Sequence, residues 1–293
     1  MAKISREALM AEARKKVKKA YSSRDRLLIH TVSSVSELDK TINLFYERLV
    51  EWYAIYFPEF NHGDPRAYCE VVLFLDKDKP DKHALTEALG HEKAEKIVKR
   101  AQQSMGSELK PEDLEQMRSL ANEVLSLYAL RDSIEDYQAS IIKELAPNLG
   151  YLVEPKLAAG LIAQAGSLER LAKMPASTIQ VLGAEKALFK HLRQHTQPPK
   201  HGLIFQFPDI NNAPLQHRGK LARALATKLA MAAKADAITH EFIAEKLKKN
   251  FEKRAAEIKT LPIKQRKKPK PEKGRPMQRG RRGAWKRQKR KRR

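Results

Sequence analysis

The sequence predicts an all-α protein that consists of a long antiparallel coiled-coil hairpin, a compact helical domain and a disordered basic tail. Three observations support this fold class. Apolar residues recur at steps of three and four over residues 24–57 and 111–146, as in heptad helices. Shorter helical patterns fill residues 147–258, separated by turns that contain Gly, Pro or Asn. Lys and Arg dominate residues 259–293.

Residues 1–23 form a short basic segment before the hairpin. This segment lacks the apolar core of a signal peptide, and no stretch of the chain reaches the roughly 20 apolar residues that a membrane span needs. We therefore expect no membrane partner. Cys69 is the only cysteine, so an intramolecular disulfide is impossible and an intracellular setting fits.

The hairpin is predicted over residues 24–146. The seam of its first helix is apolar except at Asp39, and the seam of its second helix is interrupted by Arg131 and Gln138. The first helix should end before Pro58, because proline disfavours the helical conformation of the residue before it. Two long helices with matched seams are expected to pack against each other.

Residues 58–110 contain shorter helical pieces broken by Gly and Pro, so we expect a helical tip that caps the far end of the hairpin. Several apolar side chains near this tip are left over once the two seams are paired. They are Trp52, Phe57, Val71, Val72, Leu73, Phe74 and Leu75. The two helices are expected to pack within one chain, but a two-helix hairpin buries little core, so these side chains could in addition join a second copy.

Residues 147–258 are expected to form a separate helical domain. Its predicted helices are 154–165, 167–173, 176–182, 184–194, 215–234 and 239–254. LIFQF at 203–207 is the one strand-like run. Beyond this domain, residues 259–293 hold 18 Lys and Arg against one acid, Glu272. With hardly any aliphatic residues, this tail cannot offset its ordering entropy and should be disordered when free.

Charge is distributed unevenly along the chain, whose net charge is +23. Residues 27–146 hold 14 basic and 22 acidic residues, whereas residues 147–258 hold 17 basic and 9 acidic residues. The middle of the chain should repel nucleic acid, while the ends and the C-terminal domain should attract it. The partner of the basic parts is therefore a polyanion.

The stretch GAEKALFKHLR at 183–193 opens a helix with a basic outer face. Lys186, Lys190 and Arg193 share this face and are spaced to meet successive phosphates. Leu188 and Leu192 are expected to face inward. Phe189 lies between the two faces, where it can pack inside or stack on a base. The alternative for the whole face is a solvated basic surface.

A second basic group stands at the start of an Ala-rich helix. Arg218, Lys220 and Arg223 lie near its N-terminus, where basic residues oppose the usual preference for acids and so favour a phosphate or an acidic partner. In the tail, Trp285 could stack on a base, although non-specific counterion-like binding is the simpler interpretation.

No catalytic or metal-binding constellation is visible in the sequence. His191 and His195 are four residues apart on a predicted helix and His201 is near, but no HExxH, CxxC or carboxylate cluster accompanies them. We therefore expect no metal, no cofactor and no enzymatic activity. An RNA-modifying or RNA-cleaving enzyme stays open as an alternative, as does a general RNA chaperone that acts through its tail.

Several blocks of the C-terminal domain closely resemble the Nop domain. They are MPASTIQVLGAEKALF at 174–189, HGLIFQFP at 201–208 and RGKLARALATKLAMAAKADA at 218–237, and residues 23–60 resemble the first coiled-coil helix of the same family. This domain occurs in the archaeal scaffold protein of box C/D ribonucleoproteins, in nucleolar counterparts and in a spliceosomal pre-mRNA-processing factor. The resemblance covers nearly all of residues 22–254.

The resemblance implies a non-enzymatic scaffold that binds a guide or kink-turn RNA together with its small L-seven-type kink-turn-binding protein, as the core of a box C/D particle that guides RNA 2'-O-methylation. The RNA- and RNP-binding residues predicted from the motifs are Gly183, Ala184, Glu185, Lys186, Ala187, Leu188, Phe189, Lys190, Arg193, His201, Gln206, Arg218, Lys220 and Arg223. The coiled coil of relatives mediates self-association, which we also expect here.

This sequence departs from the family pattern in three places. Lys190 stands where the family has Arg, which keeps the charge but not the planar bidentate contact, and Phe207 stands where the family often has His. Archaeal relatives dock the methyltransferase fibrillarin through an N-terminal domain that residues 1–23 do not match, so recruitment of fibrillarin is not carried over. The alternative is a kink-turn assembly factor without methylation, similar to the spliceosomal relative. We expect a cytoplasmic location in an archaeal-like cell and a nuclear or nucleolar one in a eukaryote.

Overall fold

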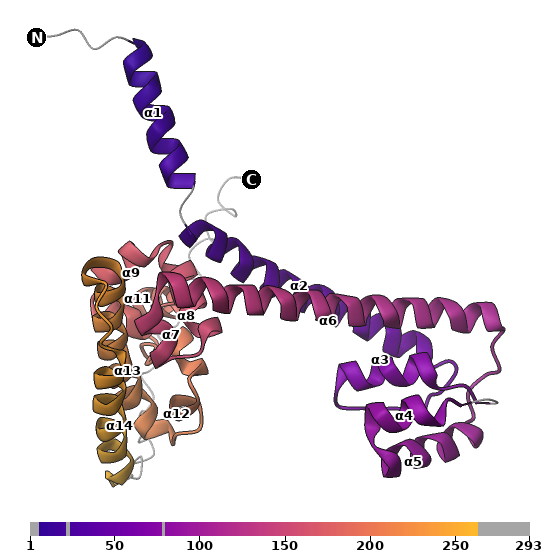
Figure 1. The fold of residues 1–293 in the computed structure, drawn as a ribbon. Coiled ribbons are helices and arrows are strands. Elements are labelled where there is room, and N and C mark those ends of the chain that lie inside the picture. Colours follow the sequence, from indigo (N-terminus) through magenta and orange to yellow (C-terminus); the bar gives the residue numbers. More distant parts are fainter. Residues whose placement is uncertain (1–5, 22–23, 78–79, 263–293) are drawn as a thin grey trace, which may run out of the picture. The chain divides into compact units, whose positions relative to one another are not determined.

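The computed structural model describes residues 6–21, 24–77 and 80–262, and the described residues form helices without any strand. In chain order the elements are α1 (Arg6–Tyr21), α2 (Arg24–Tyr53), α3 (Pro65–Phe74), α4 (Lys82–Leu89), α5 (His91–Gln102), α6 (Pro111–Leu145), α7 (Pro147–Leu152), α8 (Pro155–Ala165), α9 (Leu168–Lys173), α10 (Ala176–Val181), α11 (Glu185–Gln194), the 3-10 helix η1 (Leu203–Gln206), α12 (Pro208–Asn211), α13 (Leu215–Lys234), the π-helix η2 (Ala235–Thr239) and α14 (Ala244–Thr260). The all-α fold class is confirmed (Figure 1). Most of the predicted tail lies outside the described residues.

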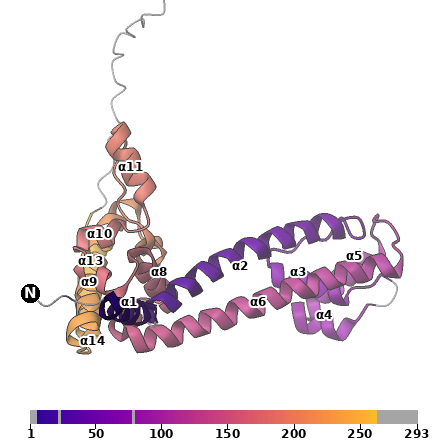
Figure 2. The same cartoon turned by 90° about the horizontal axis from the view of Figure 1, so that it is seen from above.

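Helices α2 and α6 pack side by side and antiparallel over most of their length (Figures 1 and 2). Buried residues of α2 recur every seven positions, at Leu28, Val35, Ile42 and Leu49. This spacing matches the predicted seam, and the supercoil itself stays a prediction. Helix α2 ends at Tyr53, slightly earlier than expected, because tight turns then carry the chain to Pro58.

The polar interruptions of the two seams are accommodated in different ways. Arg131 of α6 meets Asp39 of α2, with 2.7 Å between Nε and Oδ1, so the two polar seam positions pair with each other across the hairpin. Gln138 is almost fully buried, at 2% exposure. The two helices therefore stay in contact at these polar seam positions.

Helices α3, α4 and α5 cap the far end of the hairpin (Figure 1). Asp64 and Asp81 cap the N-termini of α3 and α4 through their side chains. Of the side chains expected to meet a second copy, Phe57, Val71, Val72 and Leu75 are instead buried in the core of the tip, and this part of the prediction is wrong. These four side chains pack against other apolar residues of the tip, whereas Trp52 and Phe74 are each 37% exposed.

The C-terminal domain is built around α13, which packs against α7, α9, α10 and α14. The buried face of α13 is rich in alanine, including Ala222, Ala226 and Ala233, and small side chains allow neighbouring helices to approach closely. The expected strand at 203–207 is wrong. Without a neighbouring strand among the described residues, this run forms the 3-10 helix η1, with Phe205 N–H donating to Gly202 O at 3.0 Å.

A buried polar cluster connects the start of α7 to η2, the π-helix that follows α13. The Asp236 carboxylate accepts hydrogen bonds from the backbone N–H groups of Asn148 (3.0 Å) and Leu149 (3.0 Å) and from Asn148 Nδ2 (2.7 Å). Asn148 Oδ1 in turn accepts from Ile243 N–H at 2.7 Å. Burial raises the pKa of Asp236 even though these hydrogen bonds oppose the shift.

None of the helices in the described ranges combines the length and the apolar character that spanning a membrane requires.

Candidate nucleic-acid interface

Helix α11 is largely exposed to solvent. None of its ten residues is buried; Phe189 is 58% exposed and Leu192 is 62% exposed. Lys186, Lys190 and Arg193 are exposed, as predicted. The inward direction expected for Leu192 is wrong, because α11 projects from the domain and its second half has no core to face (Figure 2).

The turn before α11 depends on Gly183 and Glu185. Gly183 has φ +85°, and a Cβ atom there would lie 2.6 Å from Leu203 Cγ. The Glu185 carboxylate accepts a hydrogen bond from Gly183 N–H at 2.8 Å and another from Gln164 Nε2 at 3.2 Å. Two residues of the predicted binding set, Gly183 and Glu185, thus shape the turn from which the exposed helix begins.

The segment before η1 is interlocked with this turn. Gly202 N–H donates to Gln180 O at 2.9 Å, and Leu203 N–H donates to Leu182 O at 2.8 Å. A Cβ atom on Gly202 would lie 1.9 Å from Leu182 O, so only glycine allows this approach. The backbone thereby holds the GAEKALF turn beside the HGLIFQF segment.

His201 and Arg218 meet on the ring of Phe205. The His201 imidazole stacks on Phe205 with ring centroids 4.5 Å apart and planes 13° apart, and the Arg218 guanidinium lies 5.2 Å from the Phe205 centroid. Burial, with the charges of Arg218 and Lys200, lowers the pKa of His201. The imidazole is therefore neutral at pH 7 and can accept or donate a hydrogen bond.

Arg218 also fixes the turn before α13. Its Nε donates to Ala213 O at 2.8 Å and its Nη2 donates to Asn211 O at 3.0 Å. Part of its hydrogen-bonding capacity is thus used within the protein. Its charge still faces the His201 side of the domain.

The predicted set therefore falls into four groups. Gly183, Ala184 and Glu185 form the turn, while Lys186, Ala187, Phe189, Lys190 and Arg193 are exposed on α11 and Leu188 is half-buried. His201 and Arg218 share Phe205. Gln206, Lys220 and Arg223 are exposed at the end of η1 and along α13.

Two residues of this surface were missed from the sequence. Lys200 is exposed, its carbonyl accepts a hydrogen bond from Gln180 Nε2 at 2.7 Å, and its Cβ would lie 3.7 Å from a Cβ on Gly219. Its position next to His201 in PPKHG was the available signal. Phe205 was missed because its stacking depends on the 3-10 helix η1, whereas the sequence predicts a strand at this run.

In the described ranges, no three His, Cys, Asp or Glu side chains are placed to hold a metal ion. His195 ends α11 in the left-handed conformation, with φ 51°. The Nδ1 atom of His191 contacts the carbonyl oxygen of Thr196. Both residues thus take part in closing the end of the helix.

The family model described as "Nop: snoRNA binding domain, fibrillarin" matches residues 34–257, which is most of the chain. The chain belongs to the Nop family. A NOP5 family protein of Methanocaldococcus jannaschii is 46% identical over 264 residues, which is 89% of this Nop-family chain and 62% of that relative. Nucleolar protein 58 of Scheffersomyces stipitis is 38% identical over 78% of the chain and 45% of its own length.

Among solved structures, a chain in the crystal structure of a fibrillarin/Nop5p complex superposes with a TM-score of 0.51 at 28% identity. The match covers 86% of this Nop-family chain and 77% of that chain. The chain thus spans about three fifths or less of the length of the curated relatives described above. The Nop model describes an RNA-binding domain rather than a catalytic one.

Proposed function

We propose that this chain is a non-enzymatic scaffold of a ribonucleoprotein. Its C-terminal domain recognises a kink-turn RNA together with the small L-seven-type protein already bound to it. The particle is of the box C/D type that guides RNA 2'-O-methylation. The observation that carries this proposal is α11, on which an exposed aromatic ring, Phe189, lies among the exposed cations Lys186, Lys190 and Arg193.

The chemistry of α11 suits the end of an RNA helix. An exposed ring can stack on a terminal base pair, and cations at helical spacing can meet the adjoining phosphates. Beside the turn that starts α11, the His201–Phe205–Arg218 stack adds a polar face with one permanent charge. Such a two-part surface fits a composite of RNA and protein better than a uniform duplex.

Binding to a kink-turn RNA with and without its L-seven-type protein tests this proposal. We expect weak, salt-sensitive binding to the bare RNA and much tighter binding to the RNA–protein complex. The double variant Lys186→Ala/Lys190→Ala should weaken the ternary complex by about 1–3 kcal/mol, because two charge-assisted phosphate contacts are lost. Isothermal titration calorimetry at two salt concentrations measures both effects.

Lys249→Ala/Lys253→Ala is the matched control, because these two lysines are also exposed, four residues apart and on a helix of the same domain, α14. This control should leave the ternary complex within about 0.5 kcal/mol of the unchanged protein. Equal affinity for the RNA with and without the kink-turn protein would contradict the proposal. So would equal losses in the two double variants.

Co-purification with fibrillarin separates a methylation scaffold from a kink-turn assembly factor without methylation. The solved relative was crystallised in a fibrillarin/Nop5p complex, and the matching family model names fibrillarin. Recovery of fibrillarin with the full chain and its RNA favours the methylation scaffold. An RNP that forms without fibrillarin favours the assembly factor.

A further inference from the structure

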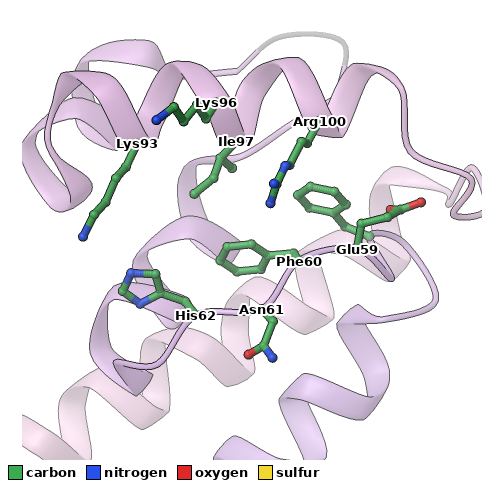
Figure 3. Close-up of a pocket in the computed structure, with 9 residues that line it drawn as sticks. Glu59, Phe60, Asn61, His62, Lys93, Lys96, Ile97 and Arg100 are labelled. Carbon is green, nitrogen blue, oxygen red and sulfur yellow. The ribbon is translucent and has the colours of Figure 1, made fainter.

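The tip of the hairpin holds a pocket that lies outside the RNA-facing elements (Figure 3). It encloses about 350 Å³, which is within the usual range for ligand pockets. The wall on one side is α5, and the other side is the segment that follows α2. The lining residues are Phe57, Glu59, Phe60, Asn61, His62, Lys93, Lys96, Ile97 and Arg100.

Two cations flank an apolar centre in this pocket. Lys93, Ile97 and Arg100 lie on one face of α5 and point toward Phe60 and His62 (Figure 3). Within the described ranges, neither Lys93 nor Arg100 forms an ion pair. Lys96, by contrast, is paired with Glu92 one turn earlier. The charges of Lys93 and Arg100 are therefore available to a ligand on either side of Ile97.

The acid in the pocket wall is already engaged. The Glu59 carboxylate accepts hydrogen bonds from the Ser104 hydroxyl at 2.6 Å and from Met105 N–H at 2.9 Å. These hydrogen bonds lower the pKa of Glu59, and its carboxylate points away from the centre of the pocket (Figure 3). The Glu59 carboxylate therefore competes little with a ligand for the charges of Lys93 and Arg100.

We propose that this pocket binds a short acidic segment of a partner protein, in which an apolar side chain lies between two acidic ones. Residues seven apart on a helix are separated by roughly 10 Å along its axis. Alternate residues of an extended peptide point to the same side, and residues four apart span roughly 13 Å. An extended segment with acids at positions one and five can thus reach the long side chains of Lys93 and Arg100, while the apolar residue at position three covers Ile97.

The same geometry disfavours RNA as the occupant. Phe60 is 7% exposed and stacks on both Phe57 and Tyr68, with centroids 5.6 Å and 4.7 Å away, so its ring faces are not open to a base. Residues 27–146 hold 22 acids against 14 basic residues, which repels a polyanion at long range. A short peptide with two acids meets far less of that repulsion.

Fluorescence anisotropy with the full chain tests the pocket. The probe is a fluorescein-labelled peptide, Gly-Ser-Glu-Ala-Phe-Ala-Glu-Gly-Ser, with sister peptides that carry Leu or Trp in place of Phe. We expect saturable binding that weakens with salt and weakens about three- to tenfold in Lys93→Gln/Arg100→Gln, because two partly exposed ion pairs are lost. Replacing both Glu by Gln, or Phe by Ala, in the peptide should weaken binding to a similar extent.

Lys82→Gln/Lys99→Gln is the matched control, since it removes the same charge from exposed positions on α4 and α5 that do not line the pocket. Circular dichroism verifies that both double variants keep their helix content. The proposal is overturned if no peptide of the set binds saturably up to about 1 mM, or if the two double variants behave alike. It is also overturned if Lys93 and Arg100 are required instead for binding oligouridine, or for a dimer seen by sedimentation. These results do not depend on the kink-turn experiments, so the two proposals can fail separately.

Discussion

At the scale of single residues, the GAEKALF motif divides into a part that builds a turn and a part that is displayed. Glu185 is the one acid in a basic stretch, and its carboxylate caps Gly183 N–H at the start of α11. An acid at that end also interacts favourably with the helix dipole. Lys186, Phe189 and Lys190 then depend on this turn for their direction. A change in the turn should therefore disturb RNA binding as strongly as the loss of a cation.

Gly183→Ala tests this dependence. We expect a loss of about 1–3 kcal/mol in the free energy of unfolding, because alanine is strained at φ +85° and its Cβ would clash with Leu203. Urea denaturation followed by circular dichroism measures the loss. Gly160→Ala is the control: it lies inside α8, nothing lies within 4 Å of its Cβ position, and alanine there should be neutral or stabilising by up to about 1 kcal/mol. Similar losses in both variants would contradict this account of the turn.

The thiol of Cys69 should be unreactive in the folded protein. It is fully buried, and burial raises its pKa from 9.0 to about 12. Because the folded pKa is the higher one, the thiol contributes stability below pH 9 that is lost as the pH rises toward 12. A colorimetric disulfide reagent at pH 8 should label no thiol in buffer and one per chain in guanidinium chloride. Rapid labelling of the native chain would contradict this burial.

At the scale of elements, the hairpin uses its polar seam residues as a pair. Asp39 and Arg131 break the apolar repeat of their own helices, yet they meet at 2.7 Å across the interface. Arg131 also contacts Glu135 at 3.0 Å. Polar pairs in a helical seam fix the register of the two helices better than they stabilise them. We therefore expect this pair to specify alignment.

A double-mutant cycle checks this role. Arg131→Leu alone should cost about 1 kcal/mol or slightly more, since it leaves Asp39 unpaired, and the partial exposure of Asp39 limits the loss. Asp39→Leu/Arg131→Leu should recover that stability, because an apolar seam replaces the pair. Urea denaturation gives the four free energies. The exposed Arg48–Glu51 pair is the control, with an expected coupling below about 0.5 kcal/mol. Additive effects of the Asp39 and Arg131 substitutions would refute the cross-seam coupling.

Periodicity predicted the long helices well and the short segments less well. Heptad spacing repeats over many turns, so the buried positions Leu28, Val35, Ile42 and Leu49 are readable from the sequence. The run LIFQF at 203–207, with four apolar residues and Gln206, fits a strand or a tight helix equally, and only tertiary contacts decide between them. The exposure of Leu192 and the cap made by Glu185 likewise depend on where α11 leaves the domain, which periodicity does not report.

At the scale of the whole molecule, charge separates the chain into regions with different partners. Residues 27–146 carry an excess of acids, while residues 147–258 and 259–293 carry an excess of bases. Long-range electrostatics should bring RNA to the C-terminal domain and the tail and keep it from the hairpin. The specific contacts we propose lie on the domain, so the tail should add affinity without adding selectivity.

Deletion of residues 263–293 tests this division. We expect weaker binding at low salt and a shallower dependence of affinity on salt, by roughly 0.7 in the log–log slope for each lost phosphate contact with single-stranded RNA. The gain in affinity from the kink-turn protein should persist, because it comes from the domain. Filter binding over a range of salt concentrations measures both quantities. Complete loss of binding to every RNA would support the general chaperone instead.

Helix α11 has a further consequence for how such a protein can evolve. An isolated helix of ten residues is marginal in water, and the side chains of Lys186, Phe189, Lys190 and Arg193 on α11 are exposed, so these four positions contribute little to the stability of the domain. Substitutions at these exposed positions should therefore change the stability of the fold little, and selection should act on them mainly through their effect on ligand binding. Lys190, where the resemblance to the family predicts Arg, is the kind of change such freedom permits. Recognition of a new RNA can be acquired there one residue at a time while the fold stays intact.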